Sequence, residues 1–146
     1  MLTEHNQSLS SIYVPLRLTY GLVPFVAGLD KFFNLLTDWT AYLPPIAVES
    51  LPVSPAVFMM VVGVIEMTAG IAVLTWFTRL GAWVVCVWLF LIALTLIMGG
   101  RYDIAVRDIV MAIGAYTLGQ VAALRGDHWM PTVVAASGVH KHATRT

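Results

Sequence analysis

A carboxyl group stands in the middle of an otherwise uncharged apolar stretch. Glu66 lies within VSPAVFMMVVGVIEMTAGIAVLTWF, residues 53–77, which contains no other charged side chain. This stretch is long enough to cross a bilayer, since about 20 apolar residues suffice. A charge at the membrane centre costs about 2.5–3.5 kcal/mol on insertion scales. Glu66 therefore needs a cationic partner, a bound proton or a function, such as carrying protons or holding a quinone head group.

Five other ionisable residues lie in or beside the apolar stretches and are candidates to work with Glu66: Arg17, Asp30, Lys31, Arg107 and Asp108. By their position along the predicted helices, the last four form a polar cluster near the outer surface. Glu66 is expected to lie alone near the midplane, with Arg17 toward the cytoplasmic surface. The outer cluster has a second interpretation, because charges at helix ends reach the interface cheaply and pair across helices.

Helical spacing predicts which sides of the helices are packed. Gly63, Glu66 and Gly70 lie at i, i+3 and i+7, so Glu66 points toward a neighbouring helix. Small residues mark the packed side of a membrane helix. Two further stripes of small and polar residues follow the same rule: Arg17, Tyr20, Gly21, Pro24, Gly28 and Lys31 in the first stretch, and Asp108, Ala112, Ala115, Gly119 and Ala122 in the last. Three basic residues, at positions 17, 31 and 107, remain possible partners of Glu66.

Composition indicates a membrane protein. Of the 146 residues, 59% are hydrophobic and 11% are charged, against about 25% charged in soluble domains. Four apolar stretches cover residues 12–36, 53–77, 80–98 and 103–124, and each must be helical because lipid offers no partners to backbone polar groups. Short connections make consecutive helices antiparallel. We predict an all-α, integral membrane, up-down four-helix bundle over residues 1–125, with a Pro-rich cap or half-helix at 37–52.

Charge distribution gives an orientation. With four spans, both termini lie on one side, together with Arg79, Arg125, Lys141 and Arg145. The positive-inside rule then places the termini and the tail, residues 126–146, in the cytoplasm. We expect a multi-pass protein of the bacterial inner membrane. The net charge of zero does not suggest nucleic-acid binding.

Redox metal ligands are scarce in this chain. The spans contain no His, and Cys86 is the single cysteine, so ligation of haem or an iron–sulfur cluster is unsupported. We expect no metal site and no cofactor bound by this chain alone, with quinone as a candidate ligand. No residue is assigned a catalytic role.

Several short motifs, in order, resemble the DoxX family of small bacterial four-helix membrane proteins. RLTYGLVPFVAGLDKFFN is similar to the family's first helix, with Gly28, Lys31 and Phe32 at its end. Glu66-x3-Gly70, followed by Arg79, resembles its second helix, and YDIAVRDIVMAIGAYTLG its fourth. The resemblance covers residues 17–124. It implies a four-helix bundle associated with redox systems, since the family name comes from a subunit of a thiosulfate:quinone oxidoreductase and other members work with superoxide dismutase or sulfur-handling partners.

Three functions compete at this point. The first is a membrane subunit or anchor of a quinone-linked oxidoreductase, itself catalytic or not, with a membrane or membrane-associated redox protein as partner. The second is a non-enzymatic scaffold or assembly factor that packs its small-residue stripes against another membrane protein. The third is a small proton-coupled transporter, which would need a homo-oligomer to enclose a path. Fold-level resemblance does not choose among them.

Overall fold

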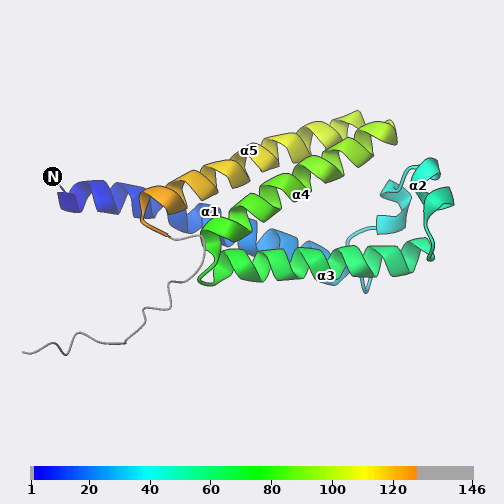
Figure 1. Ribbon diagram of the computed structural model, residues 1–146, viewed down its shortest axis with the longest axis horizontal. Helices are drawn as coiled ribbons and strands as arrows, with labels where there is room; N and C mark the ends of the chain where they lie inside the picture. Colours follow the sequence, from blue (N-terminus) through cyan, green and yellow to red (C-terminus); the bar gives the residue numbers. More distant parts are fainter. Residues whose placement is uncertain (1, 128–146) are drawn as a thin grey trace, which may run out of the picture.

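The computed structural model describes residues 2–127, and this part of the chain is helical without strands. The long helices are α1 (Leu2–Asp30), α3 (Pro55–Leu74), α4 (Thr78–Met98) and α5 (Tyr102–Leu124). A 3₁₀ turn, η1 (Trp39–Tyr42), and a short helix, α2 (Pro45–Ser50), lie between α1 and α3 at one end of the bundle (Figure 1). Four segments are long and apolar enough to cross a membrane: Leu9–Asp30, Pro55–Leu74, Thr78–Met98 and Tyr102–Leu124. The predicted all-α membrane bundle is confirmed.

The first span is shorter than predicted. It ends at Asp30 instead of residue 36, because the Asp30 carboxylate accepts hydrogen bonds from the backbone N–H groups of Leu35 and Leu36 and draws the chain into a turn. Asn34 adopts the left-handed conformation within this turn, with φ of 50°. Residues 31–54, here called the cap, therefore cover one end of the bundle, as the Pro-rich composition predicted for 37–52.

The second span is also shorter, since α3 runs over residues 55–74 and not 53–77. Its start is fixed by Ser54, whose hydroxyl accepts from the N–H of Val57, and by Pro55 in the first turn. Pro fits there because the first N–H groups of a helix have no intrahelical partner. Most of the predicted tail, at 128–146, lies outside the described residues.

Glycines bring α1 and α3 into close antiparallel contact. A Cβ added to Gly28 would lie 2.5 Å from the carbonyl oxygen of Gly63, and one added to Gly70 would lie 2.5 Å from that of Gly21. Side chains at these positions would force the backbones apart. The seven-residue spacing on each helix, 21 to 28 and 63 to 70, makes one continuous contact face.

Small residues also join α5 to the rest of the bundle. Ala112, Ala115 and Ala122 are fully buried, as the predicted stripe requires. Gly119 lies against the indole of Trp83 on α4, and Tyr116 packs edge-on against the same ring at 5.3 Å between ring centroids. The stripe is therefore used for packing inside the chain.

The core fills one half of the bundle. At the end of the bundle away from the cap, residues from all four long helices form a continuous cluster, including Tyr20, Val73, Cys86 and Leu118. Toward the cap, the buried cluster of Ala93, Leu96 and Ala105 belongs to α4 and α5 alone. The α1–α3 pair and the α4–α5 pair are thus packed tightly at one end and separate at the other (Figure 1).

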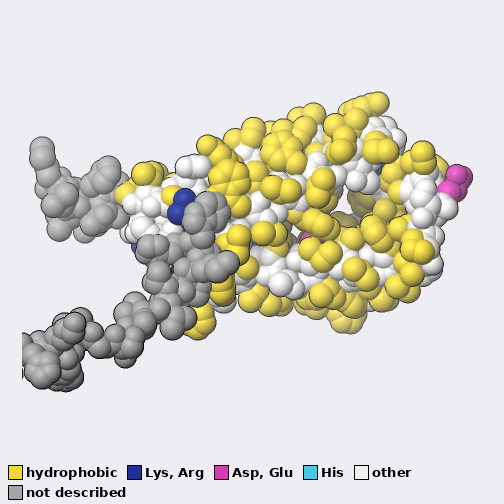
Figure 2. Space-filling view, viewed as in Figure 1, with side chains coloured by type: hydrophobic (Ala, Val, Ile, Leu, Met, Phe, Trp, Pro, Cys, Tyr) yellow, Lys and Arg dark blue, Asp and Glu magenta, His cyan; other side chains and the backbone are white. Residues whose placement is uncertain are grey.

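The outer surface is apolar over the length of the helices. Large hydrophobic side chains are exposed on every span, for example Leu22, Val61, Leu94 and Val110. Figure 2 shows hydrophobic side chains covering the face in view, with the exposed charged groups near its two ends. Such a surface is unfavourable in water and matches the hydrocarbon of a bilayer, so the chain is a multi-pass membrane protein in contact with lipid.

Candidate functional site

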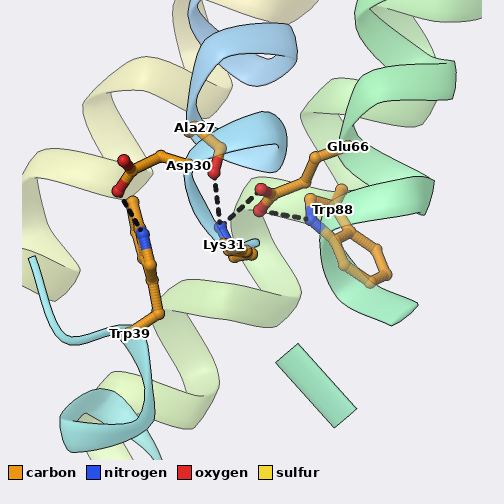
Figure 3. A network of polar contacts seen from close by, with 6 residues as sticks. All are labelled: Ala27, Asp30, Lys31, Trp39, Glu66 and Trp88. Atoms are coloured by element: carbon orange, nitrogen blue, oxygen red, sulfur yellow. Dashed lines mark hydrogen bonds and ion pairs between the residues drawn. The ribbon is translucent and has the colours of Figure 1, made fainter. Parts of the chain in front are cut away.

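The partner of Glu66 is Lys31. The Lys31 Nζ lies 2.5 Å from Oε2 of Glu66, and both side chains are more than nine-tenths buried. The indole N–H of Trp88 donates to the other carboxylate oxygen at 3.3 Å, so α1, α3 and α4 meet at this carboxyl group (Figure 3). The expectation of an isolated Glu66 is wrong. Gly28 packs against Gly63, so Lys31 follows α1 close to Glu66, and its side chain turns back along the helix, with Nζ 3.5 Å from the carbonyl oxygen of Ala27.

The close contact of the glycines positions this ion pair. A Cβ on Gly28 would also lie 3.0 Å from the Cβ of Glu66, and one on Gly63 would lie 3.2 Å from the Cβ of Lys31. The glycines therefore set the distance between the two backbones that the pair bridges. The prediction that Gly63, Glu66 and Gly70 share an inward face is confirmed, since all three are buried.

Asp30 does not take part in the ion pair. Its carboxylate accepts from the indole N–H of Trp39 at 2.8 Å, in addition to the two backbone N–H groups of the turn. Figure 3 shows Asp30 turned away from Lys31 and toward the cap. The indole that it holds lies over the Lys31 ammonium, 3.7 Å from Nζ to the ring centroid. Asp30 thus places an aromatic face on the cation.

The cap is also tied to the opposite helix pair. Arg101, in the α4–α5 connection, donates to the carbonyl oxygen of Ala41 at 2.6 Å and lies over the ring of Tyr42. At the start of η1, the Thr40 hydroxyl and N–H bind the Asp38 carboxylate and lower its pKa. The two helix pairs, although separate at this end, are bridged by the cap.

A cavity of about 400 Å³ lies beneath the cap, between the two helix pairs. Its lining is mostly apolar and aromatic, with Trp39 and Tyr42 from the cap, Phe58 from α3, and Trp88 and Leu91 from α4. Figure 2 shows a hollow on the face between α3 and α4, near the cap. Ligand pockets in proteins are typically about 300–1,000 Å³ and carry a few polar groups on apolar walls.

Ionisable groups line the cavity on two walls. Lys31 and Glu66 lie on the α1–α3 wall, and Arg107 and Asp108 on the α5 wall. Asp108 is buried and pairs with the Nε of Arg107 at 3.5 Å, while the Arg107 side chain is 68% exposed. The predicted outer cluster is therefore divided: three of its four members line the cavity, and Asp30 does not.

Arg17 lies at the other end of the bundle and does not reach Glu66. Its guanidinium donates to the carbonyl oxygens of Val73, Leu74 and Thr75 at 2.6–3.0 Å. These are carbonyls at the C-terminal end of α3, which lack partners within the helix and carry the negative end of its dipole. Arg17 thus stabilises the end of α3 and belongs to the structural framework.

Sequence reasoning missed the two tryptophans of the site. Trp88 lies in the apolar stretch 80–98, where nothing in the sequence distinguishes it from lipid-facing residues, and Trp39 lies in the Pro-rich segment 37–52. Within the part of the chain that the structure describes, no three His, Cys, Asp or Glu side chains lie together as metal ligands.

Comparison with known proteins places the chain in a family. The family model described as DoxX matches residues 12–98, which include Lys31, Glu66 and Trp88 but not α5. We expected the resemblance to extend to residue 124, and the family model matches the chain as far as the end of α4. No curated protein and no solved structure gives a significant match. Since the matched region is more than half of the chain, this four-helix membrane protein belongs to the DoxX family.

Proposed function

We propose that this DoxX-family protein is a membrane subunit of a quinone-linked redox system, and that the cavity beneath the cap holds the quinone head group. The observation that carries the proposal is the buried Lys31–Glu66 pair at the wall of a cavity of about 400 Å³. A buried ion pair is costly to maintain and is weak evidence for stability alone. Its position at a cavity wall favours a functional role.

The residues present fit a quinone. The ring is flat and apolar, and the cavity offers the aromatic side chains of Trp39, Tyr42 and Trp88. Quinone oxygens accept hydrogen bonds, and the Lys31 ammonium at the cavity wall has three N–H donors, of which one goes to Glu66. A bound quinone would supply two-electron chemistry coupled to protons. Glu66, by accepting from Lys31 and from the indole N–H of Trp88, would hold both side chains at the cavity wall.

The electrons would come from a partner protein. The spans contain one Cys and no His, so this chain lacks the ligand sets that hold haem or iron–sulfur clusters in a membrane. We therefore propose that a redox protein, in or on the bacterial inner membrane, docks on this subunit. We also propose that the chain termini lie in the cytoplasm, because the basic residues Arg79 and Arg125 lie on the same side of the membrane as the termini.

Two features count against the alternatives. The Ala112–Ala115 stripe, on which the scaffold function depends, is fully buried within the chain and packs against its own helices. The transporter would need a path across the membrane, but Val73 and Leu118 fill the bundle centre on the terminal side of the cavity. The cavity, bounded in this way, is suited to holding a ligand.

Titration of purified protein with decylubiquinone tests the proposal. Quenching of the intrinsic tryptophan fluorescence should report binding, because Trp39 and Trp88 line the cavity. Lys31→Met should weaken binding about tenfold or more, the effect of losing one interaction of about 1.4 kcal/mol. Arg125→Gln, at the opposite end of the bundle, is the matched control and should bind as the wild type does. Wild-type protein that neither binds decylubiquinone nor retains quinone on purification would refute the proposal.

A further inference from the structure

We infer that Asp108 is a second acid–base residue of the cavity, and that it would exchange one proton with a bound quinone. The inference rests on the proposed function and extends it from one wall of the cavity to two. Lys31 and Glu66 would serve the ligand from one wall, and Asp108 would serve it from the α5 wall.

The position of Asp108 follows from the packing of α5. It begins the stripe that continues through Ala112 and Ala115, and its side chain therefore points into the bundle. Below it, α5 is held against α1 where Tyr20 reaches Gly114. Asp108 lies about 9 Å beyond Gly114 toward the cap, at 1.5 Å per residue. At that level the helix pairs have separated, so its carboxyl group lines the cavity instead of a packed interface.

The few contacts of the Asp108 carboxyl group leave it available to a ligand in the cavity. Among the described residues its single ion pair is with Arg107, at 3.5 Å and through the edge of a largely exposed guanidinium. The Glu66 carboxylate, in contrast, has a partner on each oxygen, at 2.5 and 3.3 Å. Asp108 is nevertheless only 6% exposed. A buried carboxyl group with one long contact at a cavity wall can bind and release a proton toward a ligand.

The groups that face Asp108 complete the description of the site. Lys31, directly after the end of α1, Glu66 on α3 and Tyr42 on η1 line the same cavity, with Arg107 beside Asp108 on α5. The cavity lining from α4, which includes Trp88 and Thr95, contributes no acid or base. The cavity thus has two carboxyl groups, and each has a basic neighbour.

Groups on the two walls of the cavity would supply the protons of the reaction, and the partner protein would supply the electrons. A bound quinone would take two electrons from the reduced partner protein and two protons, and both of its C=O bonds would become C–OH. One proton would come from the Lys31–Glu66 pair and the other from the Asp108 carboxyl group. Both groups would then be protonated again from bulk water. In the reverse direction the same groups would accept the two protons of the quinol.

The test uses the full chain with bound decylubiquinone and dithionite as reductant. Asp108→Asn, which keeps the shape but cannot exchange a proton, should retain binding and slow reduction by about 10²–10⁴-fold, the usual contribution of a general acid. Asp108→Glu should restore much of the rate with a changed pH profile. Asp103→Asn is the control, because Asp103 lies on the same helix but is exposed and outside the cavity.

An infrared measurement tests the same role of Asp108 independently of the reduction rate. The infrared difference spectrum between oxidised and reduced ligand should contain a carboxyl C=O band that Asp108→Asn removes and Asp108→Glu shifts. If Asp108→Asn does not fold, the spectra of the wild type and of Asp108→Glu are compared. A carboxyl C=O band at the same position in both would overturn the acid–base role of Asp108. Wild-type rate and an unchanged band in Asp108→Asn would also overturn it, while binding by the wild type would leave the proposed function standing. Absence of binding by the wild type would refute both.

Discussion

Lys31 and Glu66, thirty-five positions apart in the chain, form an ion pair of 2.5 Å that joins the end of α1 to the middle of α3. The pair is buried and is reached by the indole N–H of Trp88 from α4. It therefore ties three of the four spans together at the wall of the cavity. Its energetics can be separated from its function because the two partners can be removed singly or together.

Single removal of either partner should be more harmful than removal of both. Glu66→Leu leaves the Lys31 ammonium buried without its carboxylate, and Lys31→Met leaves the carboxylate without its cation. Each should lower the free energy of unfolding by about 3–5 kcal/mol. The double variant leaves no unpaired charge and should lose less than either. Unfolding in mixed detergent micelles measures all three, and a double variant as unstable as the sum of the singles would contradict this account.

Gly28→Ala should separate α1 from α3. The added methyl group would lie 2.5 Å from the carbonyl oxygen of Gly63, so the backbones must move apart and stretch the Lys31–Glu66 pair. We expect a loss of about 1–3 kcal/mol, as for other overpacked contacts, and weaker decylubiquinone binding. Gly99→Ala is the control, because its nearest contact would be 3.5 Å and its φ is −85°. Equal stability of the two variants would show that the glycine contact is not needed.

Arg17→Gln should destabilise the end of α3 without affecting the cavity. Three carbonyl oxygens, those of Val73, Leu74 and Thr75, lose a charged donor. A hydrogen bond to a charged group contributes about 1.5–3 kcal/mol to stability, and we expect the free energy of unfolding to fall by an amount in that range. Arg17→Lys should recover little, since an ammonium cannot reproduce the planar guanidinium fork. Amide exchange at the α3–α4 turn should rise, and a change in decylubiquinone affinity would argue against a purely structural role.

Asp30→Ala should loosen the cap. The N–H groups of Leu35 and Leu36 and the indole N–H of Trp39 would lose their shared acceptor, and the indole would no longer be held over Lys31. Amide exchange should rise across residues 31–54 and the free energy of unfolding should fall by about 1–3 kcal/mol. Asp38→Ala is the comparison, because its carboxylate binds only within η1. Its effect should stay within that turn, and equal loosening by both variants would refute the anchoring role of Asp30.

Part of this site could be predicted from the sequence. The spacing of Gly63, Glu66 and Gly70 placed the carboxyl group on a packed face, since helical periodicity fixes which side chains share a side. The same reasoning found the inward stripe that contains Asp108. It could not choose among Arg17, Lys31 and Arg107 as the partner of Glu66, because that choice depends on the register in which the helices pack against one another.

The membrane bundle, its spans and the inward direction of Glu66 can be predicted from the amino-acid sequence, because hydrophobicity and periodicity act along each helix separately. The remaining features depend on contacts between helices. In the tertiary structure α1 ends at Asp30, and Lys31 forms an ion pair with Glu66. Arg17 binds the carbonyl groups at the end of α3, and a cavity lies between Glu66 and Asp108. These outcomes depend on how closely the glycines let two helices approach and on where the cap folds back, and both are set by contacts between residues distant in sequence.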